Sequence, residues 1–484
     1  MKWTVITWFI GVSLLFVAAL MTVSCIIALS IPGDESGIPL LFSAILTGAA
    51  GSFPLIFVRK GHHRLSFREG NFIVVSAWLL ACLFGMLPFM LYGGEFTPVN
   101  ALFESISGFT TTGASILNDI EALPKGLLFW RISTAWVGGV GIVTLFSMLT
   151  GRADKSTLSK AEISSIARES FAGGRSVSLA NRMLVTYVAL TVISFFSLKL
   201  TGMGWFDAAT HAMSACSTCG FSTRNTSVAF FDNPAAETVL TITMLAAGIH
   251  FGILFLAFLR GKPEYFLKSE TIKVFLSLVG LAIIAITTDL LVNGNYHSFG
   301  SALRDASFQV ASISTTTGFA TQDTTLWPSL SMSVLIICSL ICGCSGSTSG
   351  GIKIDRALLA IKGIHRKVKL TVTPNAVHSV RVDGKARSIE QISDAFGYIF
   401  CYLMIVVLFA TVNNAMGLDF TTGVTASIAC IGNVGPGFGD VGSMSNYAAF
   451  PSLLKFTSMF EMIIGRLEIF PVLYLLRSVR RKPV

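Results

Sequence analysis

Four short segments rich in threonine, serine and glycine interrupt a strongly apolar sequence. They read TTTGAS from Thr110, STCGFST from Ser217, STTTGFATQD from Ser314 and IGNVGPGFGD from Ile431. In each segment a triplet precedes a glycine, and the backbone carbonyls of such residues can replace the hydration shell of a cation. The candidate filter residues are Thr110, Thr111, Thr112 and Gly113; Ser217, Thr218, Cys219 and Gly220; Thr315, Thr316, Thr317 and Gly318; and Gly432, Asn433, Val434 and Gly435.

The residue types in these segments also indicate the kind of cation. No triplet contains an acidic side chain, and carbonyls without a ring of carboxylates suit a monovalent, weakly hydrated cation better than Ca²⁺ or Mg²⁺. A single Thr-Thr-Gly segment is equally typical of a polar turn that closes a helix. Four copies in similar surroundings favour the filter, and glycine allows backbone conformations that are closed to other residues.

The residues around each glycine predict the elements that hold it. Helix N-cap residue types stand at a constant distance before the glycines, at Asn100, Asp207, Asp305 and Thr422. The apolar stretch that follows each is too short to cross a bilayer of roughly 30 Å. It therefore predicts a re-entrant helix whose C-terminus brings partial negative charge to the middle of the membrane. The next apolar run follows a proline in every copy: Pro124, Pro234, Pro328 and Pro451.

The composition indicates a membrane protein. Only 13% of the 484 residues are charged and the mean hydropathy is +0.71, whereas a soluble domain needs a more charged surface. The run from Trp3 to Gly33 is uncharged and long, so it predicts a first spanning helix, with a cleaved secretion signal as the alternative. The sequence predicts ten spans, over 3–33, 38–58, 70–92, 127–150, 182–202, 236–259, 273–293, 331–360, 392–415 and 452–477.

The charges between these spans predict the topology. Most lysines and arginines fall in segments on one side of the predicted spans, and the opposite loops hold only Lys125, Arg224 and Arg304. The positive-inside rule therefore places both termini in the cytoplasm. The same segments account for the net charge of +9, so the charge gives no reason to expect a nucleic-acid partner.

The repeated unit is a span, a re-entrant segment and a second span. Irregular backbone at membrane depth must be buried in protein or line a watery cavity, so four units are best arranged around one pore. We therefore expect an all-α polytopic membrane protein with four pseudo-symmetric helix–pore-loop–helix repeats and a leading helix pair. The expected boundaries are 1–69 for the pair, 70–150, 182–260, 273–361 and 392–477 for the repeats, and 151–181 and 362–391 for cytoplasmic loops.

Other chemistry finds little support in the sequence. The pairs Cys216-x-x-Cys219 and Cys342-x-Cys344 could suggest a metal, but no second pair follows at zinc-finger spacing, so we interpret them as small buried residues. No phosphate-binding GxxxxGK[ST] or zinc-binding HExxH motif occurs, which argues against an enzyme. Any nucleotide dependence must therefore come through a partner, and no bound organic cofactor is expected in this chain.

The four filter segments, together with GCSGSTSGGIKIDR from Gly343, resemble the Trk/Ktr/HKT superfamily of potassium transporters, and the chain length points to its bacterial TrkH branch. The resemblance implies potassium uptake across the bacterial inner membrane, with K⁺ as the transported ion at the filter. It also implies a homodimer and a cytosolic TrkA-type ring that binds nucleotides and gates the pore. Sodium-permeable plant members often have serine at the first filter glycine, so Gly113 favours potassium over a sodium or mixed sodium/potassium conductor. Passive conduction and symport with protons or sodium remain open.

Two features beneath the filter are candidates for a gate. A run of glycines and small polar residues interrupts the second span of the third repeat, and the resemblance implies an intramembrane loop that plugs the pore; a flexible kink is the alternative. Arg466 lies within the last span, where a charge is costly, and could repel cations or bond the loop; a structural pair with Glu461 or Glu468 is the alternative. The candidate gate residues are Gly343, Ser345, Gly346, Ser347, Thr348, Ser349, Gly350, Gly351 and Arg466.

Further positions suggest support and docking roles. Residues at a constant distance before the filter glycines could brace the filter by hydrogen bonds or simply pack between repeats: Glu104, His211, Gln309 and Ala426. The basic segments 150–182 and 353–391 could dock a cytosolic partner or contact anionic membrane lipids.

Overall fold

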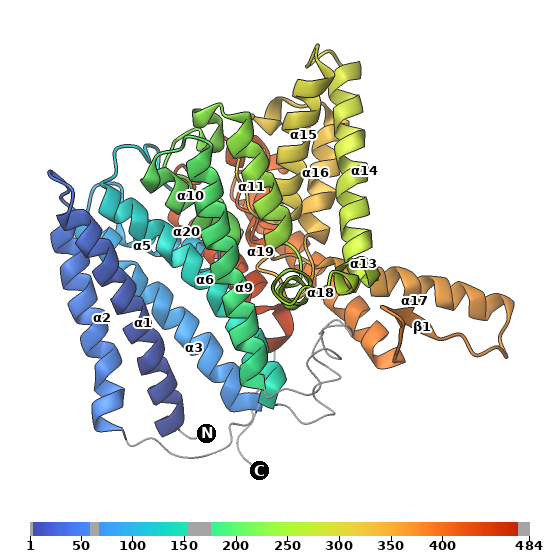
Figure 1. Cartoon of the computed structure of the whole chain (residues 1–484), viewed down its shortest axis with the longest axis horizontal. Coiled ribbons are helices and arrows are strands. Elements are labelled where there is room, and N and C mark those ends of the chain that lie inside the picture. The colour runs from blue at the N-terminus through green and yellow to red at the C-terminus, as the bar shows by residue number, and fades with distance from the viewer. Residues whose placement is uncertain (1–2, 59–66, 153–175, 473–484) are drawn as a thin grey trace.

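The computed structural model describes residues 3–58, 67–152 and 176–472. It is a helical bundle whose elements alternate between long helices and short ones that end inside the protein (Figure 1). The elements of the leading pair and first repeat are α1 (Trp3–Leu29), α2 (Gly37–Phe57), α3 (Phe67–Gly85), α4 (Leu87–Tyr92), α5 (Pro98–Phe109) and α6 (Lys125–Arg152).

The second and third repeats follow with α9 (Ser176–Leu200), α10 (Trp205–Ser217), η1 (Ser227–Phe231), α11 (Pro234–Ala247), α12 (Phe251–Leu254), η2 (Phe255–Leu259), α13 (Glu264–Lys268), α14 (Glu270–Val292), α15 (Phe299–Ser314), η3 (Thr324–Leu326) and α16 (Ser329–Ile341). The remaining elements are α17 (Ile354–Val372), β1 (Val380–Val382), β2 (Lys385–Arg387), α18 (Ile389–Ala415), α19 (Phe420–Gly432), η4 (Gly439–Val441) and α20 (Ser452–Leu467). The expectation of a helical polytopic fold is confirmed.

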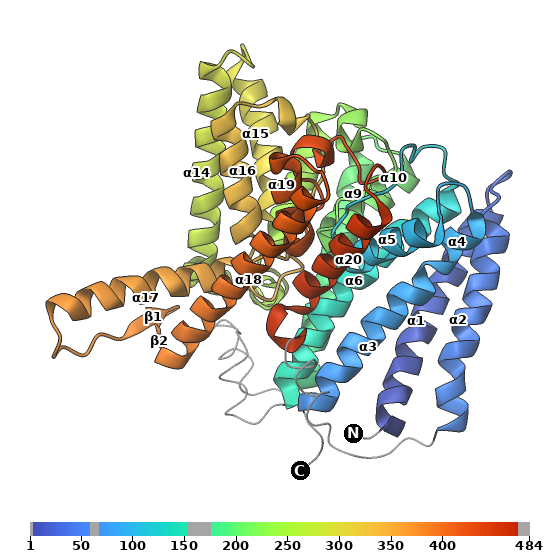
Figure 2. The same cartoon turned by 180° about the vertical axis from the view of Figure 1, so that it is seen from behind.

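Each repeat places one short pore helix between two flanking helices. The pore helices are α5, α10, α15 and α19, and they lie in the body of the bundle (Figures 1 and 2). The prediction that each following helix starts at the proline is confirmed, because α6, α16 and α20 begin directly after it and α11 begins with it. Proline fits this place because its missing N–H is not needed in the first helical turn.

The expected N-caps of the pore helices are wrong. The helices begin earlier, and their N-caps are Thr97, Gly204, Ser298 and Asp419. Asn100 and Thr422 lie one turn inside, where their backbone N–H groups donate to the side chains of Thr97 and Asp419. A second cap-type residue one turn upstream was available in these two copies, and the longer helix uses it.

The second helices of the repeats depart from the expected spans. The chain over 236–259 bends by 107° between α11 and the helix formed by α12 and η2, and the expected span 331–360 is a short helix, α16, followed by a non-helical loop and α17. The last helix, α20, ends at Leu467, before Glu468 with φ +64°. Among the described residues six helices are long and apolar enough to cross a membrane, and the bent pair adds a seventh, so the count of ten is not reproduced.

The leading pair lies at the edge of the bundle beside α3 and α6 (Figure 2). Glycine lets its two helices approach closely, since a Cβ on Gly51 would stand 2.9 Å from the carbonyl oxygen of Gly11. At the opposite edge α17 extends away from the bundle and leads to the antiparallel pair β1 and β2, in which Arg381 faces Ala386 (Figure 1). This hairpin is the only sheet among the described residues.

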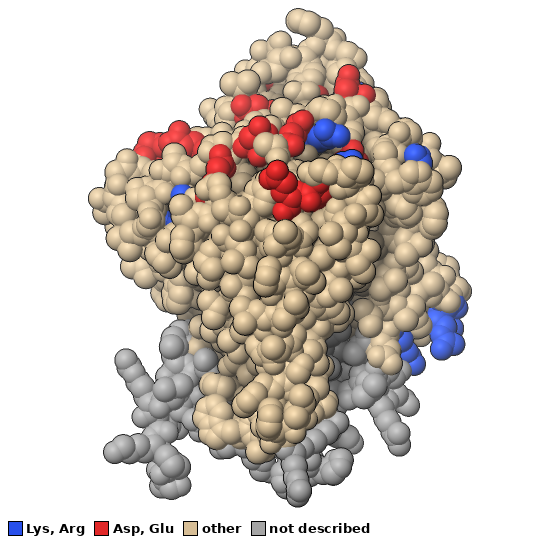
Figure 3. Space-filling view, turned by 90° about the vertical axis from the view of Figure 1, so that its left-hand side faces the viewer, with Lys and Arg blue, Asp and Glu red and all other residues tan. Residues whose placement is uncertain are grey.

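The charged side chains lie at the two ends of the bundle. Seen from the side, aspartates and glutamates gather toward the upper end with a few lysines and arginines among them, a further group of lysines and arginines lies lower down at the right, and the rest of this face is largely uncharged (Figure 3). The uncharged surface of the bundle carries exposed aliphatic and aromatic residues, such as Ile45 on α2 and Ile284 on α14. An uncharged belt between charged ends is the surface that a bilayer requires.

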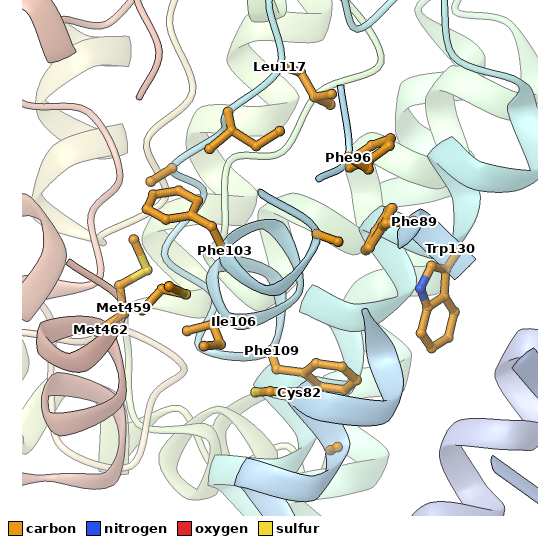
Figure 4. Close-up of a cluster of buried hydrophobic side chains, with 14 of the residues drawn as sticks. Cys82, Phe89, Phe96, Phe103, Ile106, Phe109, Leu117, Trp130, Met459 and Met462 are labelled. Carbon is orange, nitrogen blue, oxygen red and sulfur yellow. The ribbon is translucent and has the colours of Figure 1, made fainter. Parts of the chain in front are cut away.

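The core around the first pore helix shows how these helices are held. Phe103, Ile106 and Phe109 of α5 are buried among side chains of three other elements, including Cys82, Trp130 and Met459 (Figure 4). The pore helix therefore sits in an apolar socket on most of its circumference. Its C-terminal end, which carries the candidate filter, is fixed by that packing.

Candidate ion-conduction site

The four pore helices end in the same backbone motif. In each, the residue before the filter glycine donates its N–H to the carbonyl five residues earlier, and the residue before that one donates to the carbonyl three residues earlier, which is a Schellman motif. The first of these bonds are Thr112 N to Ser107 O, 2.8 Å; Cys219 N to Ser214 O, 3.1 Å; Thr317 N to Ser312 O, 2.8 Å; and Val434 N to Ala429 O, 2.9 Å.

The backbone of the four segments has the same positive φ angles. The second residue before each glycine is left-handed although it is threonine or asparagine: Thr111 at +53°, Thr218 at +55°, Thr316 at +60° and Asn433 at +53°. The glycines lie between +81° and +93°. A β-branched residue in this region is strained by roughly 1–3 kcal/mol, and such strain persists where the surrounding structure imposes it, typically at functional sites.

The four glycines form a closed ring with the segments of the next repeats. A Cβ on Gly113 would stand 1.8 Å from Cys219 O, one on Gly220 2.0 Å from Thr317 O, one on Gly318 2.4 Å from Val434 O, and one on Gly435 2.5 Å from Thr112 O. Each glycine therefore abuts the carbonyl before the next glycine, in the order one, two, three, four and back to one. No other residue type fits at these places.

The polar returns after the glycines close a second ring. Hydrogen bonds join each pair of neighbouring repeats, among them Ile120 N to Asn225 Oδ1, Ala229 N to Ala320 O, Thr324 N to Ser443 Oγ, and Tyr447 N to Ser115 O. A hollow open to the surface is lined by all four glycines together with the residues that follow them, including Ser115, Phe221 and Tyr447. The ring thus has an open mouth.

The carbonyls at this ring are largely free. In the described part of the chain, no N–H or O–H donates to the carbonyl oxygens of the three residues that end at Gly113, Gly220 or Gly318. In the fourth segment Gly435 O accepts from Tyr447 Oη at 2.9 Å. Buried carbonyls normally find a partner, so a ring of unpartnered ones marks a place that a cation can fill.

The side chains behind the ring differ between repeats. In the first and third repeats two threonine hydroxyls pair, Thr110 with Thr112 at 2.8 Å and Thr315 with Thr317 at 2.7 Å. The second repeat has Ser217 and Cys219 at these positions and the fourth has Gly432 and Val434. The fourth segment is fixed instead by Asn433, whose Nδ2 donates to Thr112 Oγ1 and to Met462 O, both at 3.0 Å.

Glu104 braces the first filter segment, as one of the two interpretations of the sequence predicted. Its carboxylate accepts from Ile116 N at 3.1 Å and from Ser115 Oγ, and it pairs with Arg131 at 2.6 Å. Arg131 also donates to Ser222 O at 3.1 Å and lies 3.6 Å from the centre of the Phe221 ring. This buried ion pair therefore joins the returns of the first two repeats.

The equivalent residues of the second and third repeats also form hydrogen bonds to the segments that follow the filter glycines. His211 Nε2 lies 3.0 Å from Ser222 Oγ, and its ring stacks on Phe319 of the next repeat. Gln309 Nε2 donates to Gln322 O at 3.3 Å. Ala426 has no polar group and packs in the core, which is the alternative interpretation, and its neighbour Thr425 accepts from Phe438 N at 2.9 Å.

The interrupted segment of the third repeat is a buried loop beneath the ring. Residues 342–354 are buried, and the loop bonds to the second repeat through Cys344 N to Gly248 O, 2.8 Å, and Thr348 Oγ1 to Cys216 O, 3.1 Å. It reaches the third filter segment where Gly350 N donates to Thr316 Oγ1 at 3.0 Å. A Cβ on Gly350 would stand 2.2 Å from Gly432 O, so it also touches the fourth pore helix.

Arg466, on α20 of the fourth repeat, forms a hydrogen bond to this loop. Its guanidinium donates to Thr348 O at 2.6 Å and to Gly138 O of α6 at 3.2 Å, and the side chain is buried. Arg466 forms no salt bridge with Glu461 or Glu468, the two partners that the sequence suggested. Glu461 bonds Ser427 instead, and Glu468 bonds Lys353 and Arg356. The loop is therefore hydrogen-bonded to a buried, positively charged side chain, and the same side chain also contacts the first repeat.

Three contributors were missed by the sequence analysis. Arg131 lies inside a predicted span, and an arginine there is a signal that could have been followed, as it was for Arg466. Thr425 and Tyr447 gave no signal, because a threonine on a helix and a tyrosine in a return segment are ordinary residues until the fold brings them to the filter. Cys219, Cys342 and Cys344 lie buried in the second filter segment and in the loop.

Comparison with known proteins identifies the family. The TrkH family, described as cation transport protein, matches residues 42–481. A Trk system potassium uptake protein TrkH of Halomonas elongata is 34% identical over 90% of each chain, and that of Escherichia coli K12 is 31% identical over 98% of each. The crystal structure of the potassium transporter TrkH from Vibrio parahaemolyticus superimposes with a TM-score of 0.89 at 29% identity, covering 99% of this chain and all of that one. The prediction that the protein is not an enzyme is confirmed, and the chain belongs to the TrkH family of cation transport proteins.

Proposed function

We propose that this protein takes up potassium across the bacterial inner membrane, through a pore formed by its own four repeats. The observation that carries the proposal is the closed ring of four glycine-containing segments, in which the carbonyls that end at Gly113, Gly220 and Gly318 have no donor among the described residues. Carbonyl oxygens without carboxylates select for a monovalent cation. The relatives named for potassium uptake also match this chain over nearly its whole length. The filter consists of the four segments from Thr110, Ser217, Thr315 and Gly432.

The loop 343–351 and Arg466 form the gate beneath this filter. The loop lies under pore-helix ends of the second, third and fourth repeats, and Arg466 ties it to the first. The side chains of the loop are small, so most of its contacts to the pore helices are hydrogen bonds, which water can replace when the loop moves. A guanidinium below a cation site opposes passage while it stays there.

Regulation and assembly follow the superfamily resemblance. The chain acts as a homodimer with both termini in the cytoplasm, and a cytosolic nucleotide-binding ring docks on the basic loops that include α17. Supporting this, α17 carries Lys362, Arg366 and Lys369 and follows the gate loop directly in sequence. Displacement of α17 by a partner would therefore pull on the loop.

Rubidium uptake into proteoliposomes of the purified protein tests the proposal. Potassium is expected to compete at a much lower concentration than sodium. Equal competition by the two ions would keep the pore and overturn the potassium assignment. If no uptake occurs, the same assay is run on Arg466→Ala; a silent variant that inserts and folds normally would overturn the pore itself.

A further inference from the structure

The fourth filter segment differs from the others at a single carbonyl. Tyr447 donates its hydroxyl to Gly435 O at 2.9 Å, while the carbonyls of Gly113, Gly220 and Gly318 receive no donor from the described residues. The superposed backbone conformations are otherwise alike, with each glycine at positive φ. The ring therefore has three carbonyls free to adjust and one that is held.

Tyr447 is itself held firmly. It is 2% exposed, its backbone N–H donates to Ser115 O at 2.8 Å, and its ring packs against Phe103 of the first pore helix with centroids 5.6 Å apart. Phe450 packs on its other side at 5.0 Å. Tyr447 is thus fixed by contacts to the first repeat, and its hydroxyl in turn fixes the Gly435 carbonyl of the fourth repeat. This is the place where the ring closes between Gly435 and Thr112.

We propose that Tyr447 is a specificity-determining positioning residue, whose hydroxyl restrains the Gly435 carbonyl so that this level of the filter cannot contract around a cation smaller than potassium. The inference rests on the proposed potassium function. Its physical basis is that discrimination between K⁺ and Na⁺ depends on the spacing or on the field strength of the coordinating carbonyls, and a donated hydroxyl fixes both. Gly432 and Val434 stand where the first and third repeats have their paired threonines, and Tyr447 adds a bond from outside the segment to those that Asn433 makes.

A matched pair of variants isolates this hydroxyl. Tyr447→Phe removes the bond to Gly435 O. Thr243→Val removes a similarly buried hydroxyl that donates to Ser194 Oγ of α9 at 3.1 Å, outside the filter. Both variants lose one neutral hydrogen bond, so their melting temperatures should fall alike, and only the first should change ion discrimination.

The readout is the ratio of sodium to potassium concentrations that halve rubidium uptake. We expect this ratio to fall roughly fivefold in Tyr447→Phe, the size that one neutral hydrogen bond supports, and to stay at the wild-type value in Thr243→Val. Incorporation of p-aminophenylalanine at 447, which keeps a donor, should restore the ratio. An unchanged ratio in a folded Tyr447→Phe protein would overturn the role of Tyr447 while leaving the potassium function in place.

Two further outcomes are distinguishable. A wild-type protein in which sodium competes as well as potassium would overturn the proposed function, whatever the variants do. Should Tyr447→Phe fail to fold, 3-fluorotyrosine at 447 keeps the shape and strengthens the donor. The ratio should then rise, and a ratio equal to that of the wild type would contradict the proposal.

Discussion

The filter ring and the level directly beneath it are built on opposite principles. At the ring, four segments of different sequence share one backbone, with the same Schellman bonds and the same positive φ angles. Beneath it, the four second helices all differ: α6 runs on without a break, α11 and the helix of α12 and η2 meet at 107°, α16 gives way to a loop, and α20 ends at Leu467. Glycines of the second helices allow the two levels to pack closely against each other.

This difference follows from what each level would do in the proposed pore. A ring of carbonyls coordinates one ion only if every repeat contributes the same geometry, so the backbone is conserved between repeats while side chains vary. An obstruction needs one repeat to supply a segment and the others to receive it. Gly138 and Gly465 allow the close approach, since a Cβ on either would stand 2.2 Å or 2.0 Å from the carbonyl of Phe109 or Ile431 at a pore-helix end.

The largest expected effect comes from breaking the ring itself. Gly220→Ala places a Cβ 2.0 Å from Thr317 O at a residue with φ +82°, so rubidium uptake should be lost. Gly202→Ala is the control: its φ is +97°, but no atom lies within 4 Å of the added Cβ, so it bears only the backbone strain, roughly 1 kcal/mol. Uptake and melting temperature check both. Activity retained in Gly220→Ala would contradict the closed ring.

The next effect concerns the brace that holds two repeats together. Arg131→Ala leaves the Glu104 carboxylate buried and unpaired, which should cost about 3–5 kcal/mol of folding stability. The exposed pair Lys268–Glu264 serves as a control, and Lys268→Ala should cost about 0–1 kcal/mol. Thermal unfolding in detergent measures both differences. Equal losses in the two variants would show that the Arg131 pair does not support the ring.

At the lower level, Arg466→Ala should raise the rate of rubidium uptake several-fold. The substitution removes the positive charge and the bond to Thr348 O, and with them two reasons for the loop to stay in place. Initial rates in proteoliposomes measure the effect, and Arg466→Lys, which keeps the charge but loses the two-pronged bonding, should lie between. A rate unchanged in a normally inserted Arg466→Ala protein would remove Arg466 from the gate.

The smallest effect is expected for an exchange between repeats. Thr317→Val loses the pair with Thr315, but the fourth repeat already has valine at the equivalent place, Val434. Stability should therefore fall by only about 1 kcal/mol, with uptake retained. Differential scanning and the uptake assay decide this. Loss of transport would show that the third repeat depends on its side chains in a way that the fourth does not.

The sequence predicted the elements that depend on short-range patterns. The pore helices, the prolines that start the next helices, and the role of glycine after each triplet follow from residue type and spacing, because capping, re-entrant length and positive φ are local requirements. Helix starts were misplaced, since several cap-type residues stood within one turn of each other. Breaks in the second helices were underestimated, because hydropathy shows how long an apolar stretch is but not whether the helix axis changes direction within it.

The amino-acid sequence by itself determined the membrane class and predicted the four repeated segments with their candidate filter residues, since these lie in composition and in recurring local motifs. Only the tertiary structure decided which atoms meet: Arg131 with Glu104, Arg466 with the loop, and Tyr447 with Gly435. The partners in these contacts come from different repeats or from distant parts of one repeat. Their pairing depends on how the four units close into a ring, which no local pattern records.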